Sequence, residues 1–567
     1  MENKYKIKGQ FASFTDLRDM VCKSKEAFGE KTLYIFTEND TRKEWTYNDL
    51  KANMDALGTA FSKLGLMGKR IAVIGETHPM YTTTYLATVC GNGTIIPLDK
   101  ELDITQVVGF LNHAEADAIV YTGSYNKKIE SIKSELPNMK LYIPIQPDES
   151  YEKSESVISA ADLIEIGKAE LENGNTSFTE LEIDVEKRSA ILFTSGTTGT
   201  SKGVMLSHKN IIFTLNSSVN STSFDENCTF ISILPIHHSY EMMCGQLGVI
   251  AIGATELIND SLKKVLKNLR EFKPTTMIMV PMVLETMHKK VWDEIRKKGL
   301  EKKVRLAMKM NSALLKVGID IREKLFGQIT AAFGGRLNCV ICGGAPVSPE
   351  IVRDFHQFGI MILEGYGITE CSPLVAVNPY GHARVRSVGP SIYGIDVKVN
   401  YDDGEKTGEI LVKGDNVMLG YFKDEQATAD VFTEDGYFRT GDIGYIKDGY
   451  IYITGRKKNV IILSNGKNVF PEEIEEYISR IPFVLESVVL GRENASGEVA
   501  ITAIVVPDMN NPEIAGKTPS EIYSAVKDAV ININKHLPSF KHVANVEVRY
   551  EEFEKNTSKK IKRYKVK

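Results

Sequence analysis

The sequence predicts an α/β protein: a large N-terminal domain of parallel α/β sheets that includes a small β-rich subdomain, followed by a small α+β C-terminal lid domain. Short apolar runs alternate with amphipathic stretches over about the first 370 residues, which is typical of parallel sheets covered by helices. After about Gly389 the apolar residues alternate instead, which indicates a β-rich region. After Arg456 helix and strand signals begin again.

The N-terminal strands are predicted from short apolar runs bounded by polar or turn-forming residues. These runs lie at residues 71–74, 94–97, 118–121, 190–194, 230–234, 277–280, 337–342 and 361–363. Helices are predicted around residues 80–90 and over 261–272, where apolar residues recur at helical spacing.

The later elements give the domain boundaries. Asp448 and Gly449 predict a tight hairpin turn, and Pro471 predicts the first residue of a helix. Further strands are predicted at residues 395–399, 408–412, 487–490 and 499–506, and a further helix at about 520–537. We therefore predict an N-terminal domain over residues 1–457, with its β-rich subdomain at about 389–455, and a lid domain over 458–567.

Composition excludes several classes of protein. The 567 residues include 43% hydrophobic and 25% charged residues with a net charge of −5, which excludes a disordered chain and disfavours a nucleic-acid binder. Seven cysteines, an odd number, indicate a reducing compartment. No apolar signal segment opens the chain, and the uncharged stretch 242–255 is shorter than a membrane span. We expect a soluble cytoplasmic protein with at most peripheral membrane contact.

Residues 194–203 predict a phosphate-binding loop directly after an apolar strand. Three glycines let backbone N–H groups converge on an anion, six hydroxyl residues add donors, and one lysine adds positive charge. A flexible linker is the alternative, but it would not follow a buried strand and end in a lysine. Because Ser201 precedes Lys202 and Gly203 follows it, the loop is not a nucleotide-binding P-loop of the usual kind. The candidate ligands are Thr194, Ser195, Gly196, Thr197, Thr198, Gly199 and Lys202.

This loop and five later motifs resemble the AMP-binding, acyl-adenylate-forming superfamily, which includes acyl-CoA synthetases, firefly-type luciferases and nonribosomal adenylation domains. The motifs occur in the family's order and cover nearly the whole chain. After the loop come Gly343-Gly344-Ala345-Pro346, Gly365-Tyr366-Gly367-Ile368-Thr369-Glu370, Tyr437-Phe438-Arg439-Thr440-Gly441-Asp442, Gly455-Arg456-Lys457-Lys458 and Lys560-Ile561-Lys562-Arg563.

The resemblance implies a two-step reaction with ATP, Mg²⁺ and CoA. A carboxylate attacks the α-phosphorus of ATP and expels pyrophosphate, and the acyl group then passes to a thiol. Glu370 is then expected to hold Mg²⁺, because a hard cation prefers carboxylate oxygen. Thr369 would donate to the α-phosphate. A helix cap is the structural alternative for this Thr-Glu pair.

The remaining implied roles concern the nucleotide and the acid. Tyr366 would stack on adenine, next to Gly343, Gly344, Ala345, Gly365 and Gly367; a core tyrosine is the alternative. Asp442 would accept the ribose hydroxyls, with Arg456 supporting ribose or phosphate. His237 would gate the acyl site or orient the carboxylate. A metal site at His237 and His238 is disfavoured, since no third ligand has suitable spacing.

The C-terminal region is expected to supply a pivot and a catalytic lysine. Lys458 would be the hinge of the lid. Many relatives have a Pro-Lys-Thr-x-x-Gly-Lys run near the end, but here Glu554 replaces the proline and Lys559 the glycine. Lys560 is the catalytic candidate, with Lys559 as the alternative and a solvated basic tail as the structural reading.

The cysteine pair Cys339 and Cys342 forms a CxxC sequence inside an apolar run, which favours structural cysteines over a redox or zinc site.

The motifs most resemble those of medium- to long-chain fatty acyl-CoA synthetases. The apolar run at residues 277–283 would supply adaptable side chains to an acyl tunnel, although core packing explains it equally well. The alternatives are activation of another acid such as an aryl acid, transfer to an acyl carrier protein, and an inactive AMP- or acyl-binding sensor.

Overall fold

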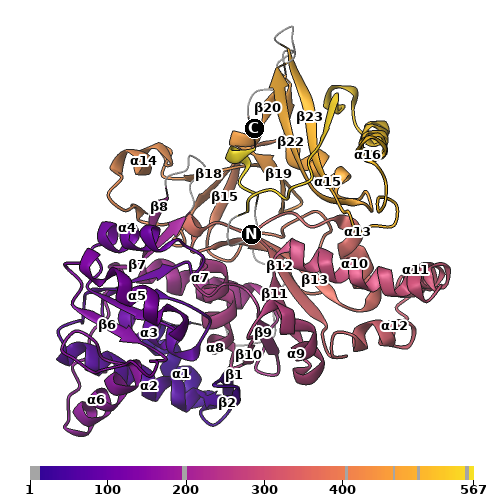
Figure 1. Cartoon of the computed structure of the whole chain (residues 1–567). Helices are drawn as coiled ribbons and strands as arrows, with labels where there is room; N and C mark the ends of the chain where they lie inside the picture. Colours follow the sequence, from indigo (N-terminus) through magenta and orange to yellow (C-terminus); the bar gives the residue numbers. More distant parts are fainter. Residues whose placement is uncertain are drawn as a thin grey trace. The chain divides into compact units, whose positions relative to one another are not determined.

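The computed structural model describes residues 13–194, 201–401, 406–463, 467–493, 498–555 and 561–566 (Figure 1). The chain forms two compact units: the first holds the described residues up to 396 together with 413–432, and the second holds 397–412 and those from 433 onward. Between residues 396 and 433 the chain therefore passes three times from one unit to the other. By this division the β-rich region groups with the C-terminal residues, and a domain boundary at Lys458 stays a prediction.

The first unit contains a seven-stranded sheet in the order β17-β8-β7-β4-β3-β5-β6. The five strands from β7 to β6 are parallel, and β8 and β17 extend the sheet as antiparallel strands. The strands are β3 (Arg70–Ile74), β4 (Thr94–Leu98), β5 (Ala118–Tyr121), β6 (Leu141–Pro144), β7 (Arg188–Thr194), β8 (Lys202–Ser207) and β17 (Gly420–Tyr421).

Helices cover both faces of this sheet. The chain runs from β3 through α3 (Pro79–Cys90) to β4, and then from β4 through α4 (Ile104–Ala114) back past β3 to β5. Right-handed crossovers in opposite directions place α3 and α4 on opposite faces. On the face covered by α4, Leu111 of α4 and Ile129 of α5 (Asn126–Ile132) pack in one core with the strand residues Ile74 and Ile96.

The second sheet of this unit has eight strands in the order β14-β13-β12-β11-β9-β10-β1-β2. The six inner strands are parallel, and the two edge strands are antiparallel to their neighbours. The strands are β1 (Thr32–Glu38), β2 (Thr41–Thr46), β9 (Thr229–Ser232), β10 (Thr255–Ile258), β11 (Thr276–Met279), β12 (Cys339–Gly343), β13 (Met361–Gly367) and β14 (Leu374–Val377). The predicted α/β class is thus confirmed, and antiparallel edges make both sheets mixed.

A large hydrophobic core packs against this second sheet. Met277 and Met279 are completely buried and pack with Leu269, Leu284 and Phe355 of the covering helices. The sequence allows an acyl tunnel or core packing as the role of residues 277–283. For these two methionines, core packing is correct. The remaining helices of the unit are α1 (Leu17–Phe28), α2 (Tyr47–Lys63), α6 (Ala160–Glu172), α7 (His208–Ser221), α8 (Gly248–Ile252), α9 (Val265–Phe272), α10 (Pro281–Lys297), α11 (Glu301–Leu315), α12 (Arg322–Ala331), α13 (Pro349–Phe358) and α14 (Glu425–Asp430), with a π-helix at Glu241–Leu247.

The second unit begins with a four-stranded sheet in the order β15-β16-β18-β19. Asp448 and Gly449 form the predicted turn between β18 and β19, with φ angles of 51° and 78°. The strands are β15 (Asp396–Tyr401), β16 (Gly408–Lys413), β18 (Phe438–Lys447) and β19 (Tyr450–Arg456).

The rest of the second unit has its own hydrophobic core, made of residues between 461 and 546. Helix α15 starts at Pro471 as predicted, because proline at the first helical position has no N–H to leave unpaired. The elements are β20 (Ile461–Ile462), β21 (Asn468–Val469), α15 (Pro471–Ile478), β22 (Val484–Glu493), β23 (Val499–Pro507), α16 (Pro519–Ile533) and β24 (Asn545–Val548). Within the described ranges, no helix is both long and apolar enough to cross a membrane.

Candidate active site

The predicted site residues of the first unit follow the carboxyl ends of parallel strands. Thr194 ends β7, His237 follows β9, Gly343 ends β12, and Thr369 and Glu370 follow β13. In open α/β sheets the carboxyl ends of the strands gather along one edge, where ligands bind. His237, Gly343, Thr369 and Glu370 follow strands of the eight-stranded sheet and share its edge, whereas Thr194 ends a strand of the seven-stranded sheet.

Glu370 lies in a 3-10 helix, Thr369–Cys371, and is held by residues near β17. The Tyr421 hydroxyl donates to Glu370 Oε1 at 3.0 Å, and the Met418 N–H donates to the Glu370 carbonyl at 2.8 Å. Burial and the nearby Glu370 carboxylate raise the pKa of Tyr421, so the phenol keeps its proton and acts as the donor. Lys202 Nζ lies 4.5 Å from the centroid of the same ring. Tyr421 thus connects the end of the phosphate loop to Glu370.

A small cavity lies beside Thr369. The Thr369 hydroxyl is 3.4 Å from the hydroxyl of Ser239, which lines the cavity together with His237 and Ser372. Ser372 Oγ is buried and has no hydrogen-bond partner in the described part of the chain. The other lining residues are mainly apolar: Tyr85, Pro97, Leu192, Leu206, Ile211, Met242, Met243 and Leu247. The cavity measures about 20 Å³, room for about one water, so an alkyl chain fits only after side chains move.

His237 is neutral in this environment. Its Nε2 atom lies 3.6 Å from Asp99 Oδ2, but burial and the nearby Lys100 lower the pKa of His237 to about 3. Burial outweighs the single carboxylate, which is too distant for a hydrogen bond. A neutral imidazole adds no positive charge to the lining of the cavity. The described residues contain no metal-binding cluster.

Behind the cavity, the π-helix Glu241–Leu247 carries a buried polar network. Gln246 donates to Glu256 Oε2 at 2.8 Å and to Glu241 Oε1 at 3.5 Å. Ser232 donates to Glu241, and Thr82 donates to Gln246 at 3.0 Å. Burial raises the pKa of Glu241 to about 7 and raises that of Glu256 above its usual range. The same π-helix contributes Met242, Met243 and Leu247 to the cavity, so this network fixes part of its wall.

The glycine motifs allow close backbone approach. A side chain at Gly367 would place its Cβ 1.9 Å from the Pro373 carbonyl oxygen, so only glycine fits there. Gly344 has a φ of 87°, and it is exposed together with Ala345. Tyr366 lies in β13 with 9% of its surface exposed. Stacking of adenine on Tyr366 stays a prediction.

In the second unit, the structure brings Asp442 and Arg456 together across the β18–β19 ladder. Arg456 Nε lies 2.9 Å from Asp442 Oδ1, and the Asp442 side chain is nearly buried. The neighbouring Glu409 carboxylate lies 2.9 Å from Lys457 Nζ and 3.5 Å from Arg439. The Glu409 contacts had no counterpart in the sequence prediction. Lys458 is exposed within the 3-10 helix Lys457–Asn459.

Several predictions lie outside the described residues. They concern Ser195, Gly196, Thr197, Thr198, Gly199, Lys559 and Lys560. Their roles stay predictions, as does the choice between the two lysines.

Cys339 and Cys342 are both buried free thiols in β12, and burial raises their pKa values. Buried thiols with raised pKa are unreactive, as expected of structural cysteines.

The sequence prediction missed Tyr421, Ser239 and Ser372. Tyr421 meets Glu370 across 51 residues of chain, a contact that no local pattern reveals. Ser239 lies two residues after the predicted His237, and Ser372 two residues after Glu370. Their nearness to predicted residues was the one available signal.

Comparison with solved structures shows a fold shared with a CoA ligase. The crystal structure of the anthranilate CoA ligase AuaEII in complex with anthranoyl-AMP has a TM-score of 0.75, with 18% identity, and covers 98% of this chain and 96% of that protein. The AMP-binding enzyme family model matches residues 22–422, and that of the AMP-binding enzyme C-terminal domain matches residues 458–566. The chain belongs to the AMP-binding enzyme family.

Two curated relatives have names that specify long-chain acids and CoA. The peroxisomal long chain acyl-CoA synthetase 6 of Arabidopsis thaliana is 30% identical over 486 residues, which span 81% of this chain and 68% of that protein. Long-chain-fatty-acid–CoA ligase 5 of Mus musculus is 27% identical over 512 residues, which span 84% of this chain and 73% of that protein.

Proposed function

We propose that this protein uses ATP to activate a long-chain fatty acid as acyl-AMP and then transfers the acyl group to CoA, releasing AMP and pyrophosphate. The names of the two curated relatives support the fatty acid and CoA. The anthranoyl-AMP complex of AuaEII supports an acyl-adenylate intermediate.

The observation that carries this proposal is the cavity beside Thr369. Its lining includes the hydroxyls of Ser239 and Ser372 and the neutral His237, and the other lining residues are mainly apolar. An acid with an apolar tail matches this division, since hydroxyls can donate to a carboxylate and apolar side chains can surround an alkyl chain. The unpaired buried Ser372 hydroxyl is a donor that a bound carboxylate would satisfy.

The adenylation chemistry needs positive charge around two anions. Lys202 and the phosphate loop would bind the phosphates of ATP, and Thr369 would donate to the α-phosphate. Glu370 fits a Mg²⁺ ion bound through one carboxylate and substrate phosphates, because Mg²⁺ often takes one or two protein carboxylates. When bound, the ion would neutralise phosphate charge. The hydrogen bond from Tyr421 fixes the direction of the Glu370 carboxylate.

The second unit would supply the remaining groups. Asp442, oriented by Arg456, would accept the ribose hydroxyls of ATP, and Lys560 would contact the attacking carboxylate and the α-phosphoryl group. A pivot at Lys458 would exchange these groups between the two steps. Under this proposal the functional boundary lies between residues 457 and 458, and the enzyme is cytoplasmic.

An aryl acid is the second candidate substrate, because AuaEII is named as an anthranilate CoA ligase. An acyl carrier protein is the alternative acceptor, and an inactive AMP- or acyl-binding sensor is the non-enzymatic alternative.

One experiment separates these functions. The protein is mixed with ATP, Mg²⁺, one of a panel of fatty and aryl acids, and either CoA or a carrier protein, and pyrophosphate and thioester are measured. We expect both products with long-chain acids and CoA. Thioester with aryl acids alone would contradict the proposed substrate, thioester on the carrier alone would contradict CoA, and no pyrophosphate with any acid would favour the sensor.

A further inference from the structure

Helix α11 and the turn after it expose an unusual number of apolar side chains. Sixteen large hydrophobic residues are exposed among those described, and four of them lie between residues 306 and 319. Leu306 is 60% exposed, Met310 50%, Val317 70% and Ile319 49%. Single exposed apolar residues are ordinary, but a contiguous group marks an interaction surface.

The exposed residues form a stripe along one side of α11. Leu306, Met310 and Ala313 follow a helical repeat within α11 and therefore share a face, and Val317 lies in the turn directly after the helix. The opposite face is also apolar: Val304, Ala307 and Met308 pack against the core of the second sheet. Because the core already covers one apolar face, the outer stripe is not needed to attach the helix.

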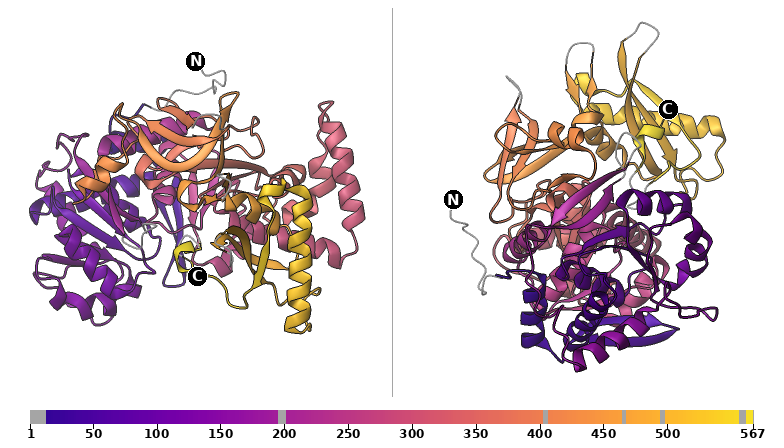
Figure 2. Two further views of the ribbon diagram at one scale, coloured as in Figure 1. Left: turned by 90° about the horizontal axis from the view of Figure 1, so that it is seen from above. Right: turned by 90° about the vertical axis from the view of Figure 1, so that its left-hand side faces the viewer.

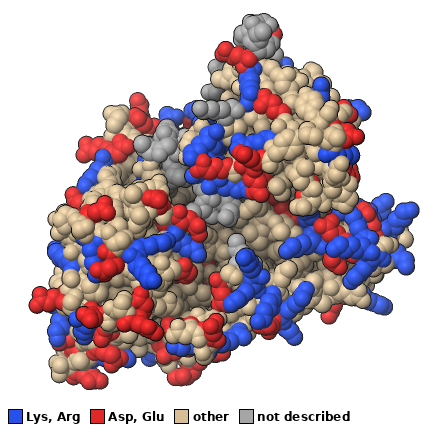
Figure 3. Space-filling model, in the orientation of Figure 1, with Lys and Arg blue, Asp and Glu red and all other residues tan. Residues whose placement is uncertain are grey.

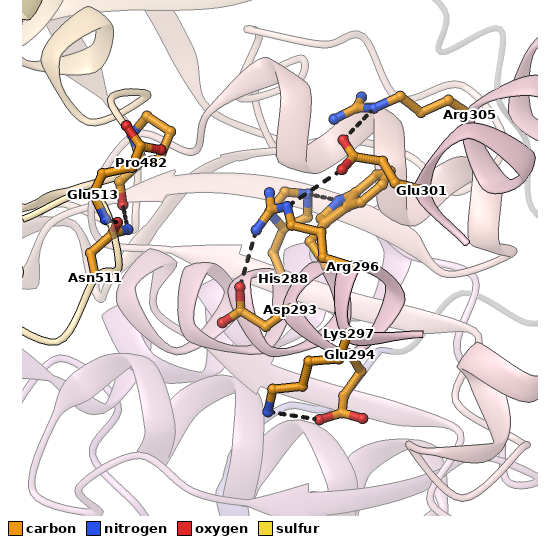
Figure 4. A network of polar contacts seen from close by, with 11 residues as sticks. His288, Asp293, Glu294, Arg296, Lys297, Glu301, Arg305, Pro482, Asn511 and Glu513 are labelled. Atoms are coloured by element: carbon orange, nitrogen blue, oxygen red, sulfur yellow. Dashed lines mark hydrogen bonds and ion pairs between the residues drawn. The ribbon is translucent and has the colours of Figure 1, made fainter. Parts of the chain in front are cut away.

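Lysines border this stripe on both sides. Lys302, Lys309 and Lys316 recur every seven residues along one side, and Lys303 lies on the other. All four are exposed, and none has an ion-pair partner in the described ranges. The arginines nearby are paired instead: Arg296 and Arg305 both contact Glu301 (Figure 4).

The surrounding segment is basic in an acidic protein. Residues 281–326 contain twelve Lys and Arg against six Asp and Glu, a net charge of +6, whereas the whole chain carries −5. Figure 3 shows lysine and arginine side chains gathered over this side of the molecule, and Figure 2 shows α10–α12 projecting at the edge of the first unit. The positive charge is therefore concentrated around the apolar stripe.

We propose that α11 and the turn after it dock onto an anionic lipid surface, with the helix axis in the plane of the membrane. An apolar stripe flanked by lysines lets aliphatic side chains enter the bilayer while the ammonium groups stay among the headgroups. A protein partner fits less well. Protein interfaces are enriched in aromatic residues and arginine and depleted in lysine, whereas residues 301–321 contain no aromatic residue and the unpaired cations are lysines.

The test is sedimentation of the full-length protein with vesicles of phosphatidylcholine, with or without phosphatidylserine. We expect binding that needs phosphatidylserine and weakens with salt. The triple variant Lys302→Gln/Lys309→Gln/Lys316→Gln should lose affinity more than tenfold, because each lysine near an anionic membrane contributes about fivefold. Leu306→Ser/Met310→Ser/Val317→Ser should also lose most of the binding, since burial of apolar side chains contributes to the affinity.

Matched controls replace exposed residues elsewhere in the same unit. Lys127→Gln/Lys153→Gln/Lys168→Gln removes the same charge, and Leu64→Ser/Tyr393→Ser removes exposed apolar surface; both should bind like the parent. Circular dichroism and thermal melting would identify a variant that fails to fold. Binding is measured without ATP or acid, so this result is independent of the proposed ligase activity.

Three outcomes would overturn the proposal. The first is that the parent protein fails to bind phosphatidylserine vesicles. The second is that the α11 variants bind as well as their matched controls. The third is that the parent binds polyglutamate but not vesicles, which would indicate an acidic protein partner. Sedimentation velocity adds a further check: self-association abolished by the serine variant, without vesicle binding, would assign the stripe to an interface between copies of this chain.

Discussion

Two pairs of buried carboxyl groups, one pair in each unit, are held in opposite ways. In the first unit, Glu241 and Glu256 contact no lysine or arginine among the described residues; Gln246 bridges them, and burial raises both pKa values. In the second unit, Asp442 faces Arg456 at 2.9 Å, and Glu409 faces Lys457 and Arg439.

This difference separates two kinds of recognition. A carboxyl group that holds its proton leaves the wall of the neighbouring cavity uncharged, which suits an apolar chain. A carboxylate oriented by a partly exposed arginine can accept hydrogen bonds from hydroxyl groups. Under the proposed function, the first unit recognises the acid and the second recognises the sugar of the nucleotide.

The largest expected effect is at Glu370, a carboxylate of the first unit that is only half-buried. Glu370→Gln keeps the shape but removes the negative charge that would attract Mg²⁺. Acid-dependent pyrophosphate exchange should fall about a hundredfold or more. Tyr421→Phe is the matched control, because it removes the hydrogen bond and keeps the charge; it should reduce exchange far less. Near-normal exchange by Glu370→Gln at moderate Mg²⁺ would remove Glu370 from the metal role.

The next effect tests whether the second unit acts in only one step. Lys560→Ala should lose formation of acyl-AMP, because a preorganised ammonium stabilises charge that develops on the α-phosphoryl group. Given synthetic acyl-AMP and CoA, the variant should still form thioester at close to the parent rate. Lys559→Ala is the control and should keep most of the first step. The reverse pattern would shift the catalytic position to Lys559, and no effect of either change would support the solvated basic tail.

A smaller effect is expected at Asp442. Asp442→Asn should raise the KM for ATP about tenfold, because the amide replaces a charge-assisted acceptor for the ribose with a weaker one. The control Glu409→Gln neutralises the adjacent carboxylate and should change the KM for ATP much less. Equal effects would mean that general negative charge, rather than Asp442 itself, binds the nucleotide.

A change at Met243 tests whether the apolar cavity of the first unit holds the alkyl chain of the acid. Met243→Trp would fill the cavity with a larger, stiffer side chain, so kcat/KM for long-chain acids should fall about tenfold and that for short acids much less. Met509→Trp changes an exposed methionine and should have no effect. A loss that is the same for all chain lengths would show that this cavity does not hold the alkyl chain.

The last expected effect leaves activity aside and is a change in stability with pH at Glu241. Its carboxyl has a usual pKa of 4.5 and a folded pKa of about 7, so between these values the folded protein keeps a proton that the unfolded chain has released. The free energy of unfolding of the parent therefore falls as the pH rises through this window, by up to about 1.4 kcal/mol per pH unit. Glu241→Gln does not titrate. Chemical denaturation should show the variant gaining stability relative to the parent from about pH 4.5 to 7; a constant difference would contradict a protonated Glu241.

Much of the fold could be predicted because its signals are local. The strand β5 matches the predicted residues 118–121, and the turn at Asp448 and Gly449 lies where predicted. Strand β1 was missed although its local signals are present, because the apolar run within Thr32–Glu38 was not read as a strand. The positive φ angles of Asn39 and Asp40 match a turn signal that would have revealed the β1–β2 hairpin.

The candidate site was predictable to the extent that it lies in contiguous motifs. Thr369, Glu370, Asp442 and Arg456 are each part of such a motif, and the structure pairs the last two. The Tyr421 contact and the Gln246 bridge join distant segments and depend on side-chain packing. No periodic pattern marked residues 241–247 as a π-helix.

The three passages of the chain between the units have a mechanical consequence. Bodies tied by backbone after residues 396, 412 and 432 cannot rotate through a change in one residue's dihedral angles, because three links must deform together. Residues beyond Lys458 are joined to the preceding chain by one link, and their core is formed by residues 461–546. Under the proposed pivot, a change of φ and ψ at Lys458 would turn that core as a block, because no second backbone link would have to stretch. The backbone thus connects β15 and β16 to the first unit at several points, whereas the α+β region after Lys458 has a single backbone connection about which it could rotate.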